Sequence, residues 1–163
     1  MSETLSPPAP RLAPFNPTHP DGAALALRLL GLGPDDLLVD LGCGDGRLLV
    51  EAVRLHGCRA RGVELCPDLC ERAQRAAAEA GVPAHVLLGD AAEHDFSDAT
   101  AVFVYLVPGG LRLLLPRLIE ALNRGARIVS YGMHPPSSSS TLALLPRSLF
   151  SAGTNPQRGK KGC

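Results

Sequence analysis

The sequence predicts one α/β domain built on a doubly wound, mostly parallel β-sheet. Helical and strand-like segments alternate five times along the chain. The strand-like segments are almost continuously apolar, which is typical of strands that are buried on both faces of a parallel sheet. The length of 163 residues is that of a single domain. Right-handed crossovers between such strands predict the strand order 3-2-1-4-5.

The first elements are defined by apolar runs and by the residues that stop them. Asp21 is expected to cap a helix from Gly22 to about Leu32, because glycine and proline follow it. A polar turn or loop separates each of the next elements from its neighbour. In chain order, these are a strand Leu37–Leu41, a helix from Arg47 to about His56, a strand Ala60–Leu65, a helix Pro67–Ala80 and a strand His85–Leu88.

A polar segment, Asp90 to Asp98, separates the third strand from the fourth. The fourth strand, Thr100–Val107, is the longest apolar and β-branched run of the chain. A helix from Gly110 to Asn123 follows, in which Pro116 predicts a kink. The strand Ala126–Tyr131 completes the alternation.

Composition changes sharply at both ends of this alternating region. Residues 1–18 hold five prolines and are expected to form an extended arm, whereas residues 19–134 form the folded domain. Residues 135–163 open with two prolines and four serines, and they contain no pair of alternating strands. We therefore expect a flexible tail that leaves the fifth strand as an exposed edge.

The overall composition excludes several classes of function. Sixteen basic residues balance sixteen acidic ones, so no general attraction to nucleic acid is expected. No apolar run is long enough to span a membrane, and no secretory or transit peptide is apparent, which predicts a cytoplasmic protein. The five cysteines are irregularly spaced and are expected to be free thiols rather than metal ligands.

A glycine-rich turn between the first strand and the next helix carries most of the functional information. Gly42, Gly44 and Gly46 stand at alternate positions, and Asp40 lies two residues upstream. Glycines let the backbone approach a ligand closely, and the helix that follows presents free N–H groups to an anion. A carboxylate beside such a turn suits an amino acid zwitterion better than a pyrophosphate, for which the spacing G-x-G-x-x-G is expected.

Acidic residues also follow the next two strands. Glu64 ends the second strand, where a carboxylate can accept hydrogen bonds from ribose hydroxyls. Asp90 follows the third strand, where it can accept the exocyclic amine of adenine while the next backbone N–H contacts the ring. Acids often end strands, but three successive ones beside a glycine turn predict a ligand with an amine, a ribose and an adenine.

The segment Asp40 to Arg47, DLGCGDGR, resembles the D/E-x-G-x-G-x-G motif of class I S-adenosylmethionine-dependent methyltransferases. Residues 14–134 look most like the small family of protein lysine methyltransferases that includes the adenine nucleotide translocase and ATP synthase c-subunit enzymes. Gly62–Leu65, the run Val102–Pro108, the strand Ala126–Ser130 and the upstream segment Pro14–Thr18 carry the narrower likeness. The Rossmann-like fold of that superfamily agrees with the predicted sheet.

The resemblance implies a cofactor, S-adenosyl-L-methionine, and a role for each matching position. Tyr105 would lie near the transferring methyl group, although an ordinary packed strand aromatic is an equally good interpretation. Asn16 and Thr18 could close over the cofactor. The implied cofactor-binding residues are Asp40, Gly42, Cys43, Gly44, Gly46, Glu64, Leu65, Asp90, Ala91 and Tyr105.

The resemblance leaves open which molecule accepts the methyl group, where the protein is located and whether the chain is catalytically active. The expected activity is lysine N-methylation of a protein substrate, and mitochondrial location is a further possibility by family likeness. Complete members carry a C-terminal antiparallel hairpin that residues 135–163 do not visibly supply. The chain could therefore bind the cofactor without catalysis and act as a binding module, or it could methylate a small molecule. The glycine spacing argues against a nicotinamide-dependent oxidoreductase.

Overall fold

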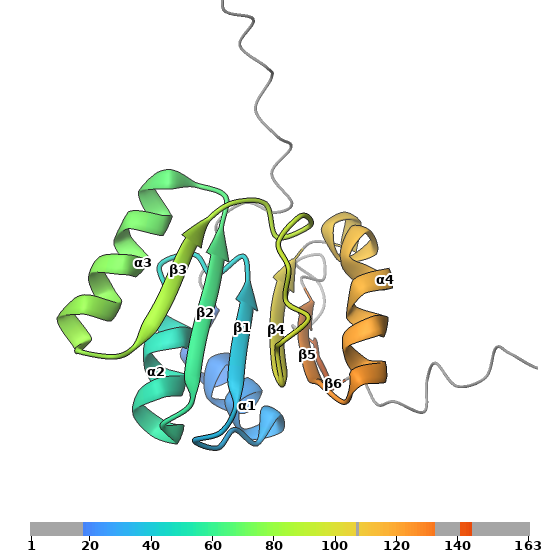
Figure 1. Ribbon diagram of the computed structural model, residues 1–163, viewed down its shortest axis with the longest axis horizontal. Coiled ribbons are helices and arrows are strands. Elements are labelled where there is room, and N and C mark those ends of the chain that lie inside the picture. The colour runs from blue at the N-terminus through green and yellow to red at the C-terminus, as the bar shows by residue number, and fades with distance from the viewer. Residues whose placement is uncertain (1–17, 107, 133–140, 145–163) are drawn as a thin grey trace, which may run out of the picture.

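The computed structural model describes residues 18–106, 108–132 and 141–144. These residues form a six-stranded sheet with the order β3-β2-β1-β4-β5-β6, flanked by helices on both faces (Figure 1). The elements in chain order are α1 (Pro20–Leu30), β1 (Leu37–Leu41), α2 (Arg47–His56), β2 (Arg59–Glu64), α3 (Pro67–Ala80), β3 (Ala84–Leu88), β4 (Ala101–Leu106), α4 (Pro108–Arg124), β5 (Arg127–Gly132) and β6 (Thr141–Leu144).

The first five strands run parallel in the predicted order 3-2-1-4-5, which confirms the fold class. β1 is the centre of the sheet, because Asp40 pairs with Gly62 of β2 on one side and with Phe103 of β4 on the other. The strand order reverses at β1, since β2 and β4 lie on its two sides. The carboxyl ends of β1, β2 and β4 therefore lie together, at the edge where doubly wound sheets bind ligands.

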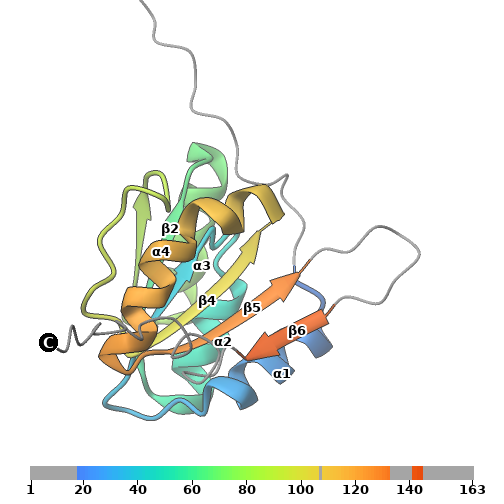
Figure 2. The ribbon, with the colours of Figure 1, turned by 90° about the vertical axis from the view of Figure 1, so that its right-hand side faces the viewer.

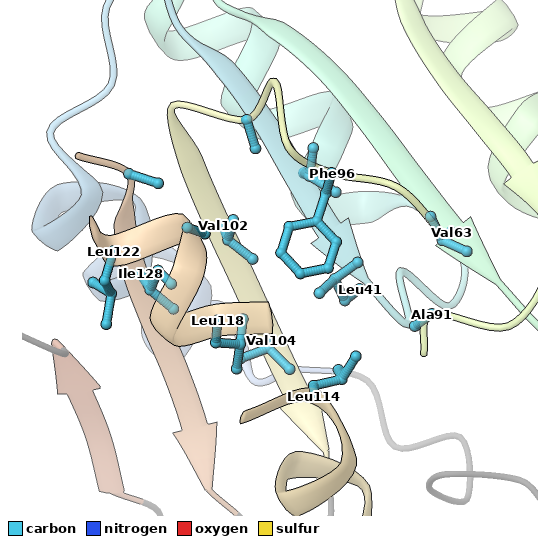
Figure 3. Packing of buried hydrophobic residues seen from close by; sticks show 14 of the residues in the cluster. Leu41, Val63, Ala91, Phe96, Val102, Val104, Leu114, Leu118, Leu122 and Ile128 are labelled. Atoms are coloured by element: carbon cyan, nitrogen blue, oxygen red, sulfur yellow. The ribbon is translucent and has the colours of Figure 1, made fainter. Parts of the chain in front are cut away.

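Two layers of helices bury the sheet. Helices α1, α2 and α3 cover one face and α4 covers the other, as the two perpendicular views show (Figure 2). On the α4 face, Phe96 packs among side chains of β1, β2, β4 and α4 (Figure 3). Phe96 follows β3 and is 1% exposed, so this core holds the connection between β3 and β4 against the sheet. The core thereby fixes the chain just after Asp90, the predicted adenine contact.

The helix boundaries differ slightly from those predicted. α1 starts at Pro20, two residues before the expected start, because His19 occupies the N-cap and its ring accepts the N–H of Asp21. Asp21 therefore lies in the first turn, and its prediction as the cap was wrong. α4 continues through Pro116, and its start at Pro108 follows β4 almost directly.

The prediction that the tail adds no strand was also wrong. β6 pairs with β5 in antiparallel orientation, with Tyr131 opposite Leu142. The fifth strand is therefore not an exposed edge along this stretch. None of the described residues supplies the second strand of a C-terminal hairpin. Only Thr18 of the predicted arm and β6 of the predicted tail belong to the described residues. The division of the chain at residues 18 and 134 therefore stays a prediction.

Candidate cofactor site

The glycine turn has the backbone conformation that its sequence predicts. Gly42, Gly44 and Gly46 all have positive φ angles, of 86°, 57° and 76°, which favour glycine because a Cβ would be strained there. The N–H groups of Gly42 and Cys43 donate to the carbonyl of Val63, at 2.9 and 3.1 Å. The turn is thus fastened to β2 before α2 begins, and Gly46 is the N-cap of α2.

Close packing explains two of the small residues in and beside this turn. A Cβ on Gly46 would lie 2.8 Å from the Cβ of Ala73 in α3, so the turn touches α3 directly. A Cβ on Gly62 would lie 2.5 Å from Sγ of Cys43, so β2 makes room for the cysteine. Burial raises the pKa of the Cys43 thiol, and the charges of Asp40 and Glu64 raise it further. Cys43 is therefore a small neutral side chain inside the turn.

Asp40 is the most unusual polar group of the site. It is only 3% exposed, and its Oδ1 has no hydrogen-bond partner in the described part of the chain. Burial, together with the negative charge of Glu64, raises the pKa of Asp40 to about 8. A buried carboxyl without a partner is costly unless a ligand supplies a donor or a positive charge. Asp40 therefore fits the amine of a zwitterionic ligand.

Glu64 ends β2 and is tied to the glycine turn. Its Oε2 accepts the N–H of Gly44 at 2.8 Å, and its Oε1 accepts the N–H of Cys66 at 2.9 Å. Each carboxylate oxygen can accept more than one hydrogen bond, so ribose hydroxyls can share these oxygens. Leu65 lies directly after the strand and is half-buried. Glu64 thus orders the turn and remains available to a nucleoside.

Asp90 and Ala91 lie in the connection that follows β3. Oδ1 of Asp90 accepts the N–H of Ala92 at 2.8 Å, which orients the carboxylate and leaves Oδ2 for a ligand. Ala91 is buried in the α4-side core. The guanidinium of Arg117, on α4, donates to the carbonyls of Ala92, at 2.5 Å, and His94. It also lies 4.7 Å above the ring of Phe96, so α4 holds this connection in place.

Tyr105 stands near the end of β4 and is half-buried. It pairs in register with Tyr131 of β5, and the two ring centroids lie 4.9 Å apart in an edge-to-face arrangement of 77°. Thr18, two residues before α1, is buried, whereas Asn16 lies outside the described residues. The structure therefore places an aromatic pair beside the carboxyl end of β1, where the cofactor turn begins.

The fold brings the predicted site residues together on four neighbouring strands and the loops that follow them. Asp40 lies in β1 and the glycine turn follows that strand, Glu64 ends β2, and Tyr105 lies on the other side, on β4. Asp90 follows β3, next to β2. Their individual roles in binding remain predictions. Two residues escaped the sequence analysis: Arg117, which offers no signal in a helical pattern, and Tyr131, whose place at a strand end was visible but whose register was not.

The described residues contain no group of three or more histidine, cysteine or acidic side chains that could hold a metal ion. Cys43, Cys58, Cys66 and Cys70 are free. No described helix has the length and apolar character that a membrane crossing requires. What the site does offer is a set of carboxylates around a glycine turn that leads into a helix N-terminus, which fits S-adenosylmethionine.

Comparisons with known proteins agree with this fit. A solved structure described as an RNA methyltransferase from Salinibacter ruber, in complex with S-adenosyl-L-homocysteine, is 35% identical, with a TM-score of 0.72 over 80% of this chain and 94% of that one. A methyltransferase from Thiobacillus denitrificans, also with S-adenosyl-L-homocysteine, gives a TM-score of 0.58 at 27% identity over 71% of this chain and 49% of that one. The fold and site thus define a class I methyltransferase that uses S-adenosylmethionine.

The family is narrower than that class. The sequence profile of the ANTKMT methyltransferase domain matches residues 40–138, and the chain belongs to this family. A protein-lysine N-methyltransferase of Saccharolobus islandicus is 32% identical over 72% of this chain and 75% of its own length. The adenine nucleotide translocase lysine N-methyltransferase of Mus musculus is 40% identical over 57% of this chain and 42% of its own length.

Proposed function

We propose that this enzyme transfers a methyl group from S-adenosylmethionine to the ε-amine of a lysine in a protein substrate. The observation that carries the proposal is the edge-to-face pair of Tyr105 and Tyr131 at the ends of β4 and β5. An aromatic wall suits the long aliphatic stem of lysine and can hold its amine near the ring face. The two lysine methyltransferases among the relatives support this choice of acceptor.

The site residues divide the work of binding. Asp40, buried and without a partner for Oδ1, takes the amine of the methionine moiety, and the N-terminus of α2 after Gly46 favours its carboxylate. Glu64 accepts the ribose hydroxyls. Asp90 accepts the adenine amine through Oδ2, while the N–H of Ala91 contacts the ring. When bound, the cofactor supplies a methyl group on a positively charged sulfur, which is already an activated leaving group.

The rest of the site aligns the acceptor. The lysine nitrogen attacks the methyl carbon in line with the carbon–sulfur bond, whose electron pair stays on sulfur, and the nitrogen loses a proton to solvent. Tyr105 excludes water from one side of the nitrogen, and removal of water favours the neutral amine that the reaction needs. Asp40 and Glu64 place negative charge at the cofactor end of the pocket, which complements the charge of the sulfonium and amine.

The test is a transfer assay with radiolabelled S-adenosylmethionine on a cell lysate, with Glu64→Gln as a matched control that loses one carboxylate. Label in protease-sensitive material, mapped by mass spectrometry to lysine, is the expected result. Label in material that passes a size filter would instead indicate a small-molecule acceptor. Calorimetric binding of S-adenosylhomocysteine without any label transfer would contradict the proposal and favour a cofactor-binding module.

RNA is a second candidate acceptor, favoured by the likeness to the Salinibacter ruber structure. The balance of sixteen basic and sixteen acidic residues argues against it, because RNA-binding chains usually carry excess positive charge. The same lysate assay separates the two acceptors. Label that ribonuclease releases and protease does not would support RNA and refute lysine methylation.

A further inference from the structure

We propose that Tyr131 is a positioning residue for methyl transfer. Its ring holds Tyr105 edge-on at the acceptor end of the site, and α1 holds the ring of Tyr131 in turn through the close approach of Gly22. This inference rests on the proposed function, because it takes Tyr105 to face the acceptor. It adds a residue and an element, α1, that neither the glycine turn nor the acidic residues involve.

Tyr105 and Tyr131 form a ring pair with a defined geometry. The parallel register sets Tyr131 directly beside Tyr105, and the rings meet edge to face with centroids 4.9 Å apart. This arrangement lets the positive edge of one ring meet the negative face of the other, and it is favoured over a face-to-face stack. Tyr131 is 9% exposed, whereas Tyr105 is half-buried. The inner ring is therefore fixed by its surroundings, and it gives the outer ring a fixed aromatic neighbour.

The start of α1 lies close to the ring of Tyr131. A Cβ on Gly22 would lie 3.1 to 3.2 Å from Cε2, Cζ and Oη of Tyr131. The backbone of α1 therefore lies against the ring, and a side chain at this position would require the ring to shift by a few tenths of an ångström. Figure 2 shows the start of α1 beside the carboxyl end of β5. Tyr131 also belongs to the buried cluster that α1 forms with β1, β4 and β5, so its ring is held from two sides.

The composition of the chain makes this arrangement measurable. Tyr105 and Tyr131 are its two tyrosines, and it has no tryptophan. Tyrosine ring signals in an NMR spectrum of selectively labelled protein therefore come from these two residues alone. An edge-to-face neighbour shifts the ring signals of its partner through the ring current. The orientation of Tyr105 can thus be followed without any activity measurement.

The experiment compares two substitutions at one position. Tyr131→Phe keeps the ring and should leave kcat and the Tyr105 ring signals close to those of the wild type. Tyr131→Leu removes the ring, so the Tyr105 signals should move and kcat should fall about three- to tenfold, the range expected for loss of one aromatic pair. The affinity for S-adenosylhomocysteine, measured by calorimetry, should be unchanged in both. Phe103→Leu, a ring loss in the same buried cluster, is the control and should leave kcat unchanged.

Gly22→Ala provides a second variant that changes neither tyrosine. The added methyl group should displace the Tyr131 ring and move the signals of both tyrosines, with a smaller loss of kcat. Unchanged Tyr105 signals in Tyr131→Leu, or an equal loss of kcat in Phe103→Leu, would overturn the inference while leaving the proposed function intact. If the wild-type protein transfers no methyl group at all, the proposed function fails and the positioning role fails with it.

Discussion

Asp40 should release a proton when the cofactor binds. In the free protein, burial and the nearby charge of Glu64 raise the pKa of Asp40 to about 8, so roughly nine-tenths of the molecules carry the protonated acid at pH 7. The proposed contact with the cationic amine of the cofactor favours the ionised form and should lower this pKa. Binding at pH 7 should therefore expel close to one proton per site.

Calorimetry in buffers of different ionisation enthalpy measures this proton. The observed binding enthalpy of S-adenosylhomocysteine should change with the buffer at pH 7, in proportion to the proton that is released. Affinity should rise about tenfold per pH unit up to the pKa of about 8 and level off above it. Asp40→Asn should abolish the proton release and should weaken binding at pH 9 by about ten- to a hundredfold, because a charge-assisted hydrogen bond is lost.

The raised pKa of Asp40 should also make the stability of the free protein depend on pH. Stability should fall as the pH rises, whereas the affinity for the cofactor should increase. A carboxyl whose folded pKa is raised stabilises the fold below its unfolded pKa, and that contribution is lost as the pH rises through the folded pKa. Between pH 4 and pH 8, the free energy of unfolding of the free protein should therefore fall by up to ~1.4 kcal/mol per pH unit, and Asp40→Asn should remove this slope.

Glu64→Gln is the control for the proton-release experiment. Because burial is the larger cause of the raised pKa of Asp40, proton release on binding should shrink but persist in this variant. Proton release that Asp40→Asn leaves unaltered would refute the reasoning.

Three further outcomes are expected. Glu64→Ala should raise the Kd for S-adenosylhomocysteine about tenfold or more, because it removes an acceptor for ribose and for two backbone N–H groups; an unchanged Kd would make Glu64 an ordinary strand-end acid. Gly46→Ala should cost about 1–3 kcal/mol in a denaturant titration, more than Gly57→Ala, which has a similar φ of 67° but nothing within 4 Å of its added Cβ; equal losses would show that the contact with α3 is unimportant. Removal of residues 141–163 should lower the Tm by roughly 5 °C relative to removal of residues 145–163, because only the first deletion takes away β6; identical melting curves would contradict the pairing of β6 with β5.

The parallel sheet could be predicted because each of its strands carries its own signal. The run Leu37–Leu41 is buried at every position, so it is apolar except at Asp40, and that exception marks the site. The glycine turn was predictable for the same reason, since its positive φ angles leave few alternatives to glycine. Local sequence therefore determined both the elements and the carboxylates at their ends.

What could not be predicted depends on contacts between distant segments. β6 has only four residues, after a proline- and serine-rich stretch, and it is defined by its antiparallel register against β5 rather than by a pattern of its own. The role of Arg117 could not be predicted for the same reason, because its partners are two backbone carbonyls that lie 23 and 25 residues away in the sequence. Every residue of a chain has a backbone carbonyl acceptor, so the sequence does not indicate which two carbonyls will accept hydrogen bonds from an arginine.

Within the site, the features that local sequence predicts lie apart from those that depend on contacts between distant segments. The proposed cofactor half lies at the ends of β1, β2 and β3, where local motifs suffice. The proposed acceptor half combines the end of β4 with β5 and α1, whose contacts join Tyr105 to Tyr131 and Tyr131 to Gly22. The proteins that this chain resembles include ones named for lysine and for RNA methylation, and we propose that the acceptor is selected on this second half. Substitutions that change the acceptor without changing cofactor affinity should therefore lie on β4, β5 and the start of α1, and not in the glycine turn.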